Sequence, residues 1–146
     1  MARTEREGCQ GEKLTLRWLE RAQPLALLVL RFVLGVIMVA HGYGKVFGGL
    51  SHHVQFVHTL GLSGWLGYLS AGAEFIGGLM VLLGVATRIG ALLILLDLLV
   101  AIWKVHMHQG LRGGLEFPLS VAAIAFALIF FGGGPISVEW IWKGKS

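Results

Sequence analysis

Ionisable side chains that could bind a polar ligand or carry protons interrupt the most apolar stretches of this chain. Three are cations and three are anions: Arg31, Lys45, Lys104, Glu74, Asp97 and Glu116. A single charge at the centre of a bilayer costs about 3 kcal/mol or more, so such residues pair with one another or line a polar cavity. The balanced set leaves two interpretations. Either ion pairs fix the packing of helices, or a cavity binds a polar or redox-active headgroup or relays protons.

Each of these side chains belongs to a row of small or charged residues. The four rows are Arg31, Gly35, Met38, Gly42 and Lys45; Gly67, Ala71, Glu74 and Gly78; Gly90, Asp97, Ala101 and Lys104; and Glu116, Ser120, Ala123 and Ala127. Steps of three, four and seven residues keep each row on one side of a helix. Because the opposite faces carry Leu, Val, Ile and Phe, we expect these to contact lipid and the small faces to meet in a bundle.

The composition indicates an integral membrane protein whose main partner is the lipid bilayer. Hydrophobic residues make up 55% of the chain and charged residues only 14%, against about 25% charged residues in soluble domains. The net charge of +4 is no signal for nucleic-acid binding, because much of the excess lies in the N-terminal tail. The single cysteine, Cys9, excludes an intramolecular disulfide and a CxxC redox pair.

Periodicity and turn residues predict an all-α membrane protein with four transmembrane helices in an up-down bundle and one short interfacial helix. The transmembrane helices are expected at 24–41, 64–84, 89–105 and 116–131. Pro24 is a favourable first residue for a helix. The segment 50–60 is too short and too polar to cross a bilayer of about 30 Å, and its pattern fits a helix that lies at the interface.

Basic residues predict the orientation in the membrane. They concentrate in the tail 1–22, at Arg88 and in the ending "WKGKS", and such residues favour the cytoplasmic side. Both termini are therefore expected in the cytoplasm. We expect a basic tail at 1–22, a transmembrane domain at 23–132 and a short C-terminal tail at 133–146. The opposite side would carry His52, His53, His58, His106 and His108.

Depth along the helices sorts the charged residues into two layers. At 1.5 Å per residue, Arg31 lies about 10 Å, Asp97 about 14 Å and Glu74 about 20 Å from the cytoplasmic end. These three are expected to form a group in the middle of the membrane. A second group is expected near the outer end and comprises Lys45, Lys104, Glu116, His41 and His106. His41 lies off the row of small residues, so we expect it to contact a neighbouring helix or the outer loops.

Nucleotide, haem and metal sites are disfavoured by spacing. The stretch "VAHGYGKVFGG" lacks both the GxGxxG and the GxxxxGK patterns, and no strand precedes it. Haem could be held between His41 and His106, and a divalent metal by His106, His108 and a loop histidine. Neither spacing matches a recognised motif, so we predict no metal site and disfavour haem.

Several stretches resemble one family of small bacterial membrane proteins. They are "LRFVLGVIMVAHGYGKVFGG", "AGAEFIGGLMVLLGVATRIGALLILLDLLVAI", "HMHQG" with "GLEFPL", and "FGGGPISVEW". Over residues 28 to 140 the chain resembles the DoxX family, most specifically from Glu74 to Arg88. The positions that match are Arg31, His41, Lys45, Glu74, Arg88 and Glu116. Asp97 is an addition to the family pattern, and Glu139 stands where the family often has Asp.

The resemblance implies a multi-pass protein of the bacterial cytoplasmic membrane. Founding members of the family are described as membrane subunits of a thiosulfate:quinone oxidoreductase, and distant kin act in assembly. The first hypothesis is therefore a subunit that binds a quinone or another amphiphile and works with a redox partner protein or a larger membrane complex. The second is a non-enzymatic accessory protein that stabilises or assembles a complex, with structural charges. The chain lacks the cysteines of thiol-redox branches, which argues against direct disulfide chemistry.

Overall fold

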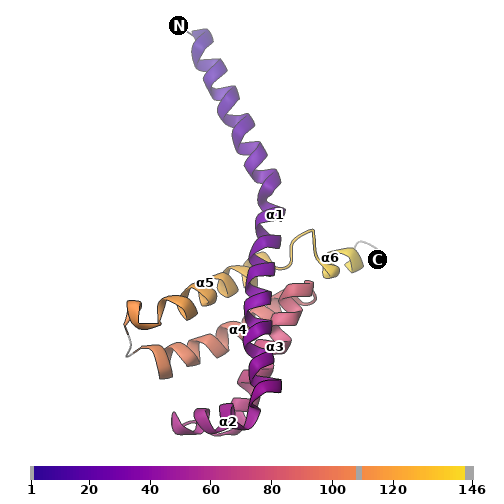
Figure 1. Ribbon diagram of the computed structural model, residues 1–146. Helices are drawn as coiled ribbons and strands as arrows, with labels where there is room; N and C mark the ends of the chain where they lie inside the picture. Colours follow the sequence, from indigo (N-terminus) through magenta and orange to yellow (C-terminus); the bar gives the residue numbers. More distant parts are fainter. Residues whose placement is uncertain (1, 108–109, 144–146) are drawn as a thin grey trace.

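The computed structural model describes residues 2–107 and 110–143, with side chains from residue 18 onward except those of residues 112 and 143. This part of the chain is helical and contains no strand. Its α-helices are α1 (Ala2–Gly48), α2 (Leu50–Thr59), α3 (Trp65–Leu83), α4 (Thr87–Ala101), α5 (Glu116–Phe131) and α6 (Val138–Lys143). In Figure 1, α1 forms a long rod, α2 turns off at the end far from the N-terminus, and α4 and α5 lie side by side. The all-helical prediction is confirmed.

The first helix is much longer than the sequence predicts. We expected it at 24–41, but α1 runs without interruption from Ala2 to Gly48, with Pro24 inside it. A proline removes one backbone hydrogen bond and strains the preceding turn. Here it does not end the helix, because the preceding segment is rich in residues that favour helices, such as Glu, Leu, Lys and Arg. The apolar part suited to a membrane begins at Trp18.

The remaining helices begin and end close to their predicted limits. The interfacial segment forms α2, and 116–131 forms α5 at the expected residues. Gly84 ends α3 in the left-handed conformation, with φ of 72°, which glycine adopts without steric cost. Beyond α4 the chain continues as a single π-helical turn, η1 (Ile102–His106), and a short 3₁₀ turn, η2 (Leu111–Gly113), precedes α5.

Glycines let three helices approach one another at backbone distance. A Cβ atom at Gly42 of α1 would lie 2.5 Å from the backbone nitrogen of Phe75 in α3, and one at Gly78 would lie 2.8 Å from that of Val39. Between α3 and α4, a Cβ at Gly90 would lie 2.9 Å from the carbonyl oxygen of Gly77. Small residues at these crossings are what close packing in lipid requires.

The inward faces form an apolar core, and the outward faces are suited to lipid. Leu34, Val81, Ile94 and Leu128 are fully buried, and large apolar residues are exposed along every long helix. In the described part of the chain, three helices are long and apolar enough to cross a membrane: Trp18–Gly48, Trp65–Leu83 and Thr87–His106. The fourth, α5, has 16 residues and spans about 24 Å, less than a bilayer core of about 30 Å. Its crossing stays a prediction.

Candidate functional site

A buried ion pair joins α1 to α3. The Lys45 Nζ atom lies 2.7 Å from Glu74 Oε1, and the side chains are 28% and 7% exposed, respectively. Lys45 is in the last turn of α1, and Glu74 is in the middle of α3. The close approach of the two backbones at Gly42 brings them together. A charge-assisted contact of this length, mostly shielded from water, is among the stronger polar interactions in proteins.

A second carboxylate lies beside this pair. Asp97 of α4 is half-buried, and its side chain is adjacent to Ser70 and Glu74 of α3 and within electrostatic range of Lys45. The second oxygen of Glu74, Oε2, is fully buried and has no hydrogen-bond partner among the described residues. Two carboxyl groups therefore share one amine. We call Lys45, Glu74, Asp97, Ser70 and His53 the polar cluster.

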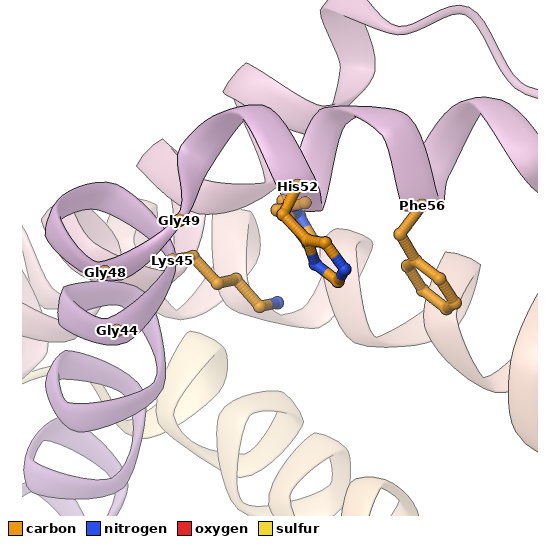
Figure 2. Close-up of a pocket in the computed structure, with 7 residues that line it drawn as sticks. Gly44, Lys45, Gly48, Gly49, His52 and Phe56 are labelled. Atoms are coloured by element: carbon orange, nitrogen blue, oxygen red, sulfur yellow. The ribbon is translucent and has the colours of Figure 1, made fainter.

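The polar cluster lies under a pocket of about 400 Å³ between α1 and α2. The residues that line the pocket are Gly44, Lys45, Gly48, Gly49, His52, His53 and Phe56. Figure 2 shows Lys45 extending from α1 toward His52 of α2, with Phe56 one turn further along α2. Gly44, Gly48 and Gly49 leave Lys45 as the one side chain that lines the pocket from the α1 side in the described residues. The pocket thus connects the surface to the buried ion pair through Lys45.

His53 links the pocket to the polar cluster. Its Nε2 atom lies 3.3 Å from Ser70 Oγ, and the ring is half-buried. Burial lowers the pKa of His53 from its ordinary value of 6.5, and the positive charge of Lys45 lowers it further, while Glu74 acts in the opposite direction. The ring is therefore mainly neutral near pH 7, and it can both accept and donate a proton.

The group predicted in the middle of the membrane is only partly formed: Glu74 and Asp97 are adjacent, but Arg31 does not join them. Its guanidinium donates from Nε to the Val81 carbonyl (3.1 Å) and from Nη1 to those of Gly133 and Ile136 (both 2.7 Å). The Val81 carbonyl belongs to the last turn of α3. Carbonyls at a helix C-terminus lack helical partners and carry partial negative charge, so they stabilise a buried cation without a carboxylate. We call this the arginine site.

The predicted outer group is also only partly assembled. Lys45 pairs with Glu74 of the other predicted group. The Lys104 ammonium lies 4.7 Å from the ring centroid of Trp103. Glu116 is exposed at the start of α5. Depth along the helices predicts that these side chains lie in one layer, but in the structure each has different surroundings.

The histidines proposed for haem or metal bind their own helices. His41 Nδ1 contacts the Ile37 carbonyl at 2.8 Å, and its ring stacks on Phe117 of α5 at 5.6 Å between centroids. His106 Nδ1 contacts the Ala101 carbonyl at 3.1 Å. Within the described part of the chain, no three His, Cys, Asp or Glu side chains are grouped to hold a metal. His108 lies outside the described residues.

Sequence reasoning missed Ser70 and the specific role of His53. Ser70 lies four residues before Glu74, so helical spacing alone could have placed it on the same face. The contact of His53 depends instead on how α2 docks. A Cβ at Gly67 would lie 2.8 Å from Val54 Cα, so this glycine lets α2 reach α3. No periodicity within α2 contains that information.

Comparisons with known proteins agree with the family resemblance seen in the sequence. The sequence profile of the DoxX family matches residues 26–107, a range that includes the whole polar cluster. The chain is also 33% identical over 122 residues to "Putative oxidoreductase CatD" of Bacillus subtilis (strain 168). The aligned region covers 83% of this chain and 90% of that protein. No solved structure matches significantly.

Proposed function

This chain belongs to the DoxX family of bacterial membrane proteins, and on that premise we propose that it is a membrane subunit of a quinone-linked oxidoreductase. In this proposal the pocket above the polar cluster binds the headgroup of a quinone or a related amphiphile. The observation that carries it is the Lys45–Glu74 pair, which is largely buried and yet borders a pocket. The name of the Bacillus subtilis relative supports the oxidoreductase class.

The residues of the pocket fit a flat ring with polar edges. Its volume of about 400 Å³ lies in the usual range for small-molecule sites, about 300–1,000 Å³. The glycine side leaves room for a planar group, and Phe56 offers an aromatic face. Lys45 and His52 supply hydrogen-bond donors of the kind that carbonyl oxygens accept. A quinone, when bound, would accept two electrons and two protons.

The residues of this chain would position the ring and hold protons next to it. Lys45 would share its donors between the bound headgroup and Glu74. Glu74 and Asp97 would store a proton below the pocket, since carboxyl groups in such positions serve as general acids and bases. We propose that electrons come from a redox partner protein or a larger membrane complex, because the sequence contains no flavin or haem motif.

The proposal includes a topology in the membrane. All four apolar helices, including the shorter α5, would cross the bacterial cytoplasmic membrane, within a domain at 23–132. Both tails, 1–22 and 133–146, would lie in the cytoplasm. The distribution of basic residues supports this orientation, which places the pocket and α2 on the outer side. The arginine site would then lie toward the cytoplasm.

The alternative is a non-enzymatic protein that assembles or stabilises a membrane complex. One observation favours it: Arg31, a charge that the sequence marks as a functional candidate, is satisfied entirely by backbone carbonyls. If the polar cluster had the same purpose, no ligand would be needed. The two functions are separated by whether the pocket binds a quinone.

Binding can be tested with the full chain in lipid vesicles or detergent. A short-chain ubiquinone and a menaquinone analogue are titrated while the unfolding temperature is recorded. At a hundredfold excess over Kd, a bound ligand stabilises by about 2.7 kcal/mol, which gives a measurable shift. We expect Lys45→Met to remove the shift, and Glu20→Gln, a change on the exposed N-terminal part of α1, to retain it. A wild-type protein with no shift for either quinone would contradict the proposal.

A further inference from the structure

Polar side chains from four helices form a continuous path from the pocket into the helix bundle. His53 of α2 borders the pocket and contacts Ser70 of α3 at 3.3 Å. Ser70 and Glu74 are both adjacent to Asp97 of α4. Lys45 of α1 completes the set at 2.7 Å from Glu74. We propose that this path loads a proton shared between Glu74 and Asp97, and that the proton enters from the pocket through His53 and Ser70.

The count of charges requires such a proton. If Glu74 and Asp97 were both ionised, Lys45 would neutralise only one of them, and the cluster would hold one net negative charge. An uncompensated net charge at a largely buried position costs more than a paired or protonated group. A single added proton on either carboxyl group makes the set of three neutral. Among the described residues, the charged side chains that act on Asp97 are Glu74 and Lys45.

The unpaired oxygen of Glu74 indicates where the proton is held. Glu74 is 6% exposed, and its Oε2 atom has no donor among the described residues. Buried polar atoms in proteins are nearly always hydrogen-bonded. The neighbouring Asp97 carboxyl can form a hydrogen bond with Glu74 only if one of the two groups is protonated. The shared proton would therefore satisfy the hydrogen-bonding requirement as well as the charge balance.

His53 suits the entrance to the path because it changes its protonation state readily. The groups that act on it are Lys45 from α1, His52 from its own helix and Glu74 from α3. Burial and the charge of Lys45 keep the ring mainly neutral near pH 7, so it accepts a proton on the pocket side only briefly. Ser70, whose hydroxyl both donates and accepts, then connects the ring to the carboxyl groups.

This inference rests on the site of the proposed function but does not require a quinone. The protein would load the proton in the absence of any redox ligand. An experiment without quinone therefore tests the proton path by itself, and a failure to bind quinone would leave it intact. Conversely, quinone binding without a protonated carboxyl group would leave the proposed quinone site and remove the proton store.

The experiment is infrared spectroscopy of the full chain in lipid vesicles without quinone. A protonated carboxyl group absorbs separately from a carboxylate, and its band shifts in D₂O when the proton exchanges. We expect the wild-type protein near pH 7 to show such a band, and Glu74→Gln and Asp97→Asn each to remove it. A band that is missing in the wild type, or that persists in both variants, would overturn the shared proton.

The entrance is tested by the exchange rate of the same band. His53→Gln keeps a hydrogen-bonding side chain next to Ser70 but cannot titrate. We expect it to slow exchange by about a hundredfold, the low end of what a positioned acid–base group contributes. The matched control is His58→Gln, an exposed change on the same helix that does not border the pocket. Equal slowing in both variants, or none in His53→Gln, would refute entry through His53.

Discussion

Buried charge is compensated in different ways at the two ends of the contact between α1 and α3. At the arginine site, the Arg31 guanidinium donates to four backbone carbonyls and borders no carboxylate in the contacts described. At the polar cluster, two carboxyl groups share one amine, and a buried carboxylate oxygen lacks a partner. The same helices thus hold one charge that is fully satisfied and one group that is not.

The difference separates a structural charge from one that is available for chemistry. The carbonyls around Arg31 belong to α3 and to the loop after α5, so the side chain fixes that loop against the helix. The one unpartnered side-chain atom described at this end is the neutral hydroxyl of Thr87. A pocket of about 460 Å³ also lies beside the loop after α5, but Arg31 does not line it. Lys45 and His53 do line the pocket above the polar cluster, and the charges of that cluster are unbalanced. Four predictions test whether this contrast is real.

The largest effect is expected from Arg31→Met. The substitution leaves several carbonyls without donors, at about 1–3 kcal/mol for each buried group that stays unsatisfied, so we expect a loss of about 4 kcal/mol in the free energy of unfolding. Arg31→Lys should recover only part of it, because an ammonium cannot reproduce the planar fork of donors. Thermal unfolding in detergent measures both.

The matched control for this prediction is Arg88→Met. Arg88 is exposed and donates a hydrogen bond of 3.3 Å to the Phe130 carbonyl. Exposed substitutions of this kind change stability by about 0.5 kcal/mol. Equal losses for Arg31→Met and Arg88→Met would show that the arginine site is not the structural anchor that its contacts indicate.

The second prediction concerns the ion pair of the polar cluster. Lys45→Met leaves Glu74 and Asp97 without a cation, and breaking a buried pair costs about 3–5 kcal/mol. We expect about 3 kcal/mol, because the Lys45 side chain is 28% exposed and water screens part of its charge. The double variant Lys45→Met/Glu74→Leu should regain most of this stability. Unfolding in detergent gives the stability, and quinone titration shows whether the regained fold has lost its ligand.

A double variant that is stable and still binds quinone would remove the distinction between the two ends. A stable variant without binding would show that these charges serve a ligand rather than the fold. The comparison with Arg31 is direct, because its acceptors among the described residues are backbone carbonyls, which a second side-chain substitution cannot remove.

Much of the fold could be predicted from the sequence, while the pairing of charges could not. The small-residue rows identified the helix faces that meet, and Gly42, Gly78 and Gly90 lie at the contacts they predict. Depth estimates failed for Arg31, because they rank residues along a helix and ignore backbone carbonyls as partners. The carbonyls of Gly133 and Ile136 belong to a loop whose return to α1 no local pattern encodes.

The third prediction uses two neighbouring glycines in α1. A Cβ at Gly42 would lie 2.5 Å from the Phe75 backbone nitrogen, whereas one at Gly44 would meet nothing within 4 Å. We expect Gly42→Ala to cost about 2 kcal/mol, typical of overpacking, and to separate Lys45 from Glu74. Gly44→Ala should keep the fold and change only the pocket wall. Unfolding and quinone titration on both variants measure these effects, and equal stabilities would contradict the close contact of α1 and α3.

The smallest expected effect is a dependence of stability on the titration of His53. Its pKa is lowered in the folded protein, first by burial and then by Lys45, from an ordinary value of 6.5. Above both pKa values the ring is neutral in the folded and unfolded states and contributes nothing. As the pH falls below 6.5, the unfolded chain binds a proton that the folded protein resists, so stability decreases.

We therefore expect the wild-type protein to lose a small part of its stability between pH 6.5 and the lowered folded pKa. His53→Gln should remove this part of the acid loss, and the exposed His58→Gln should not. The measurement is the free energy of unfolding at several pH values for the three proteins. Arg31 cannot contribute in this range, because its guanidinium stays charged. An acid loss that is unchanged in His53→Gln would show that His53 contributes no more to this pH dependence than the arginine site does.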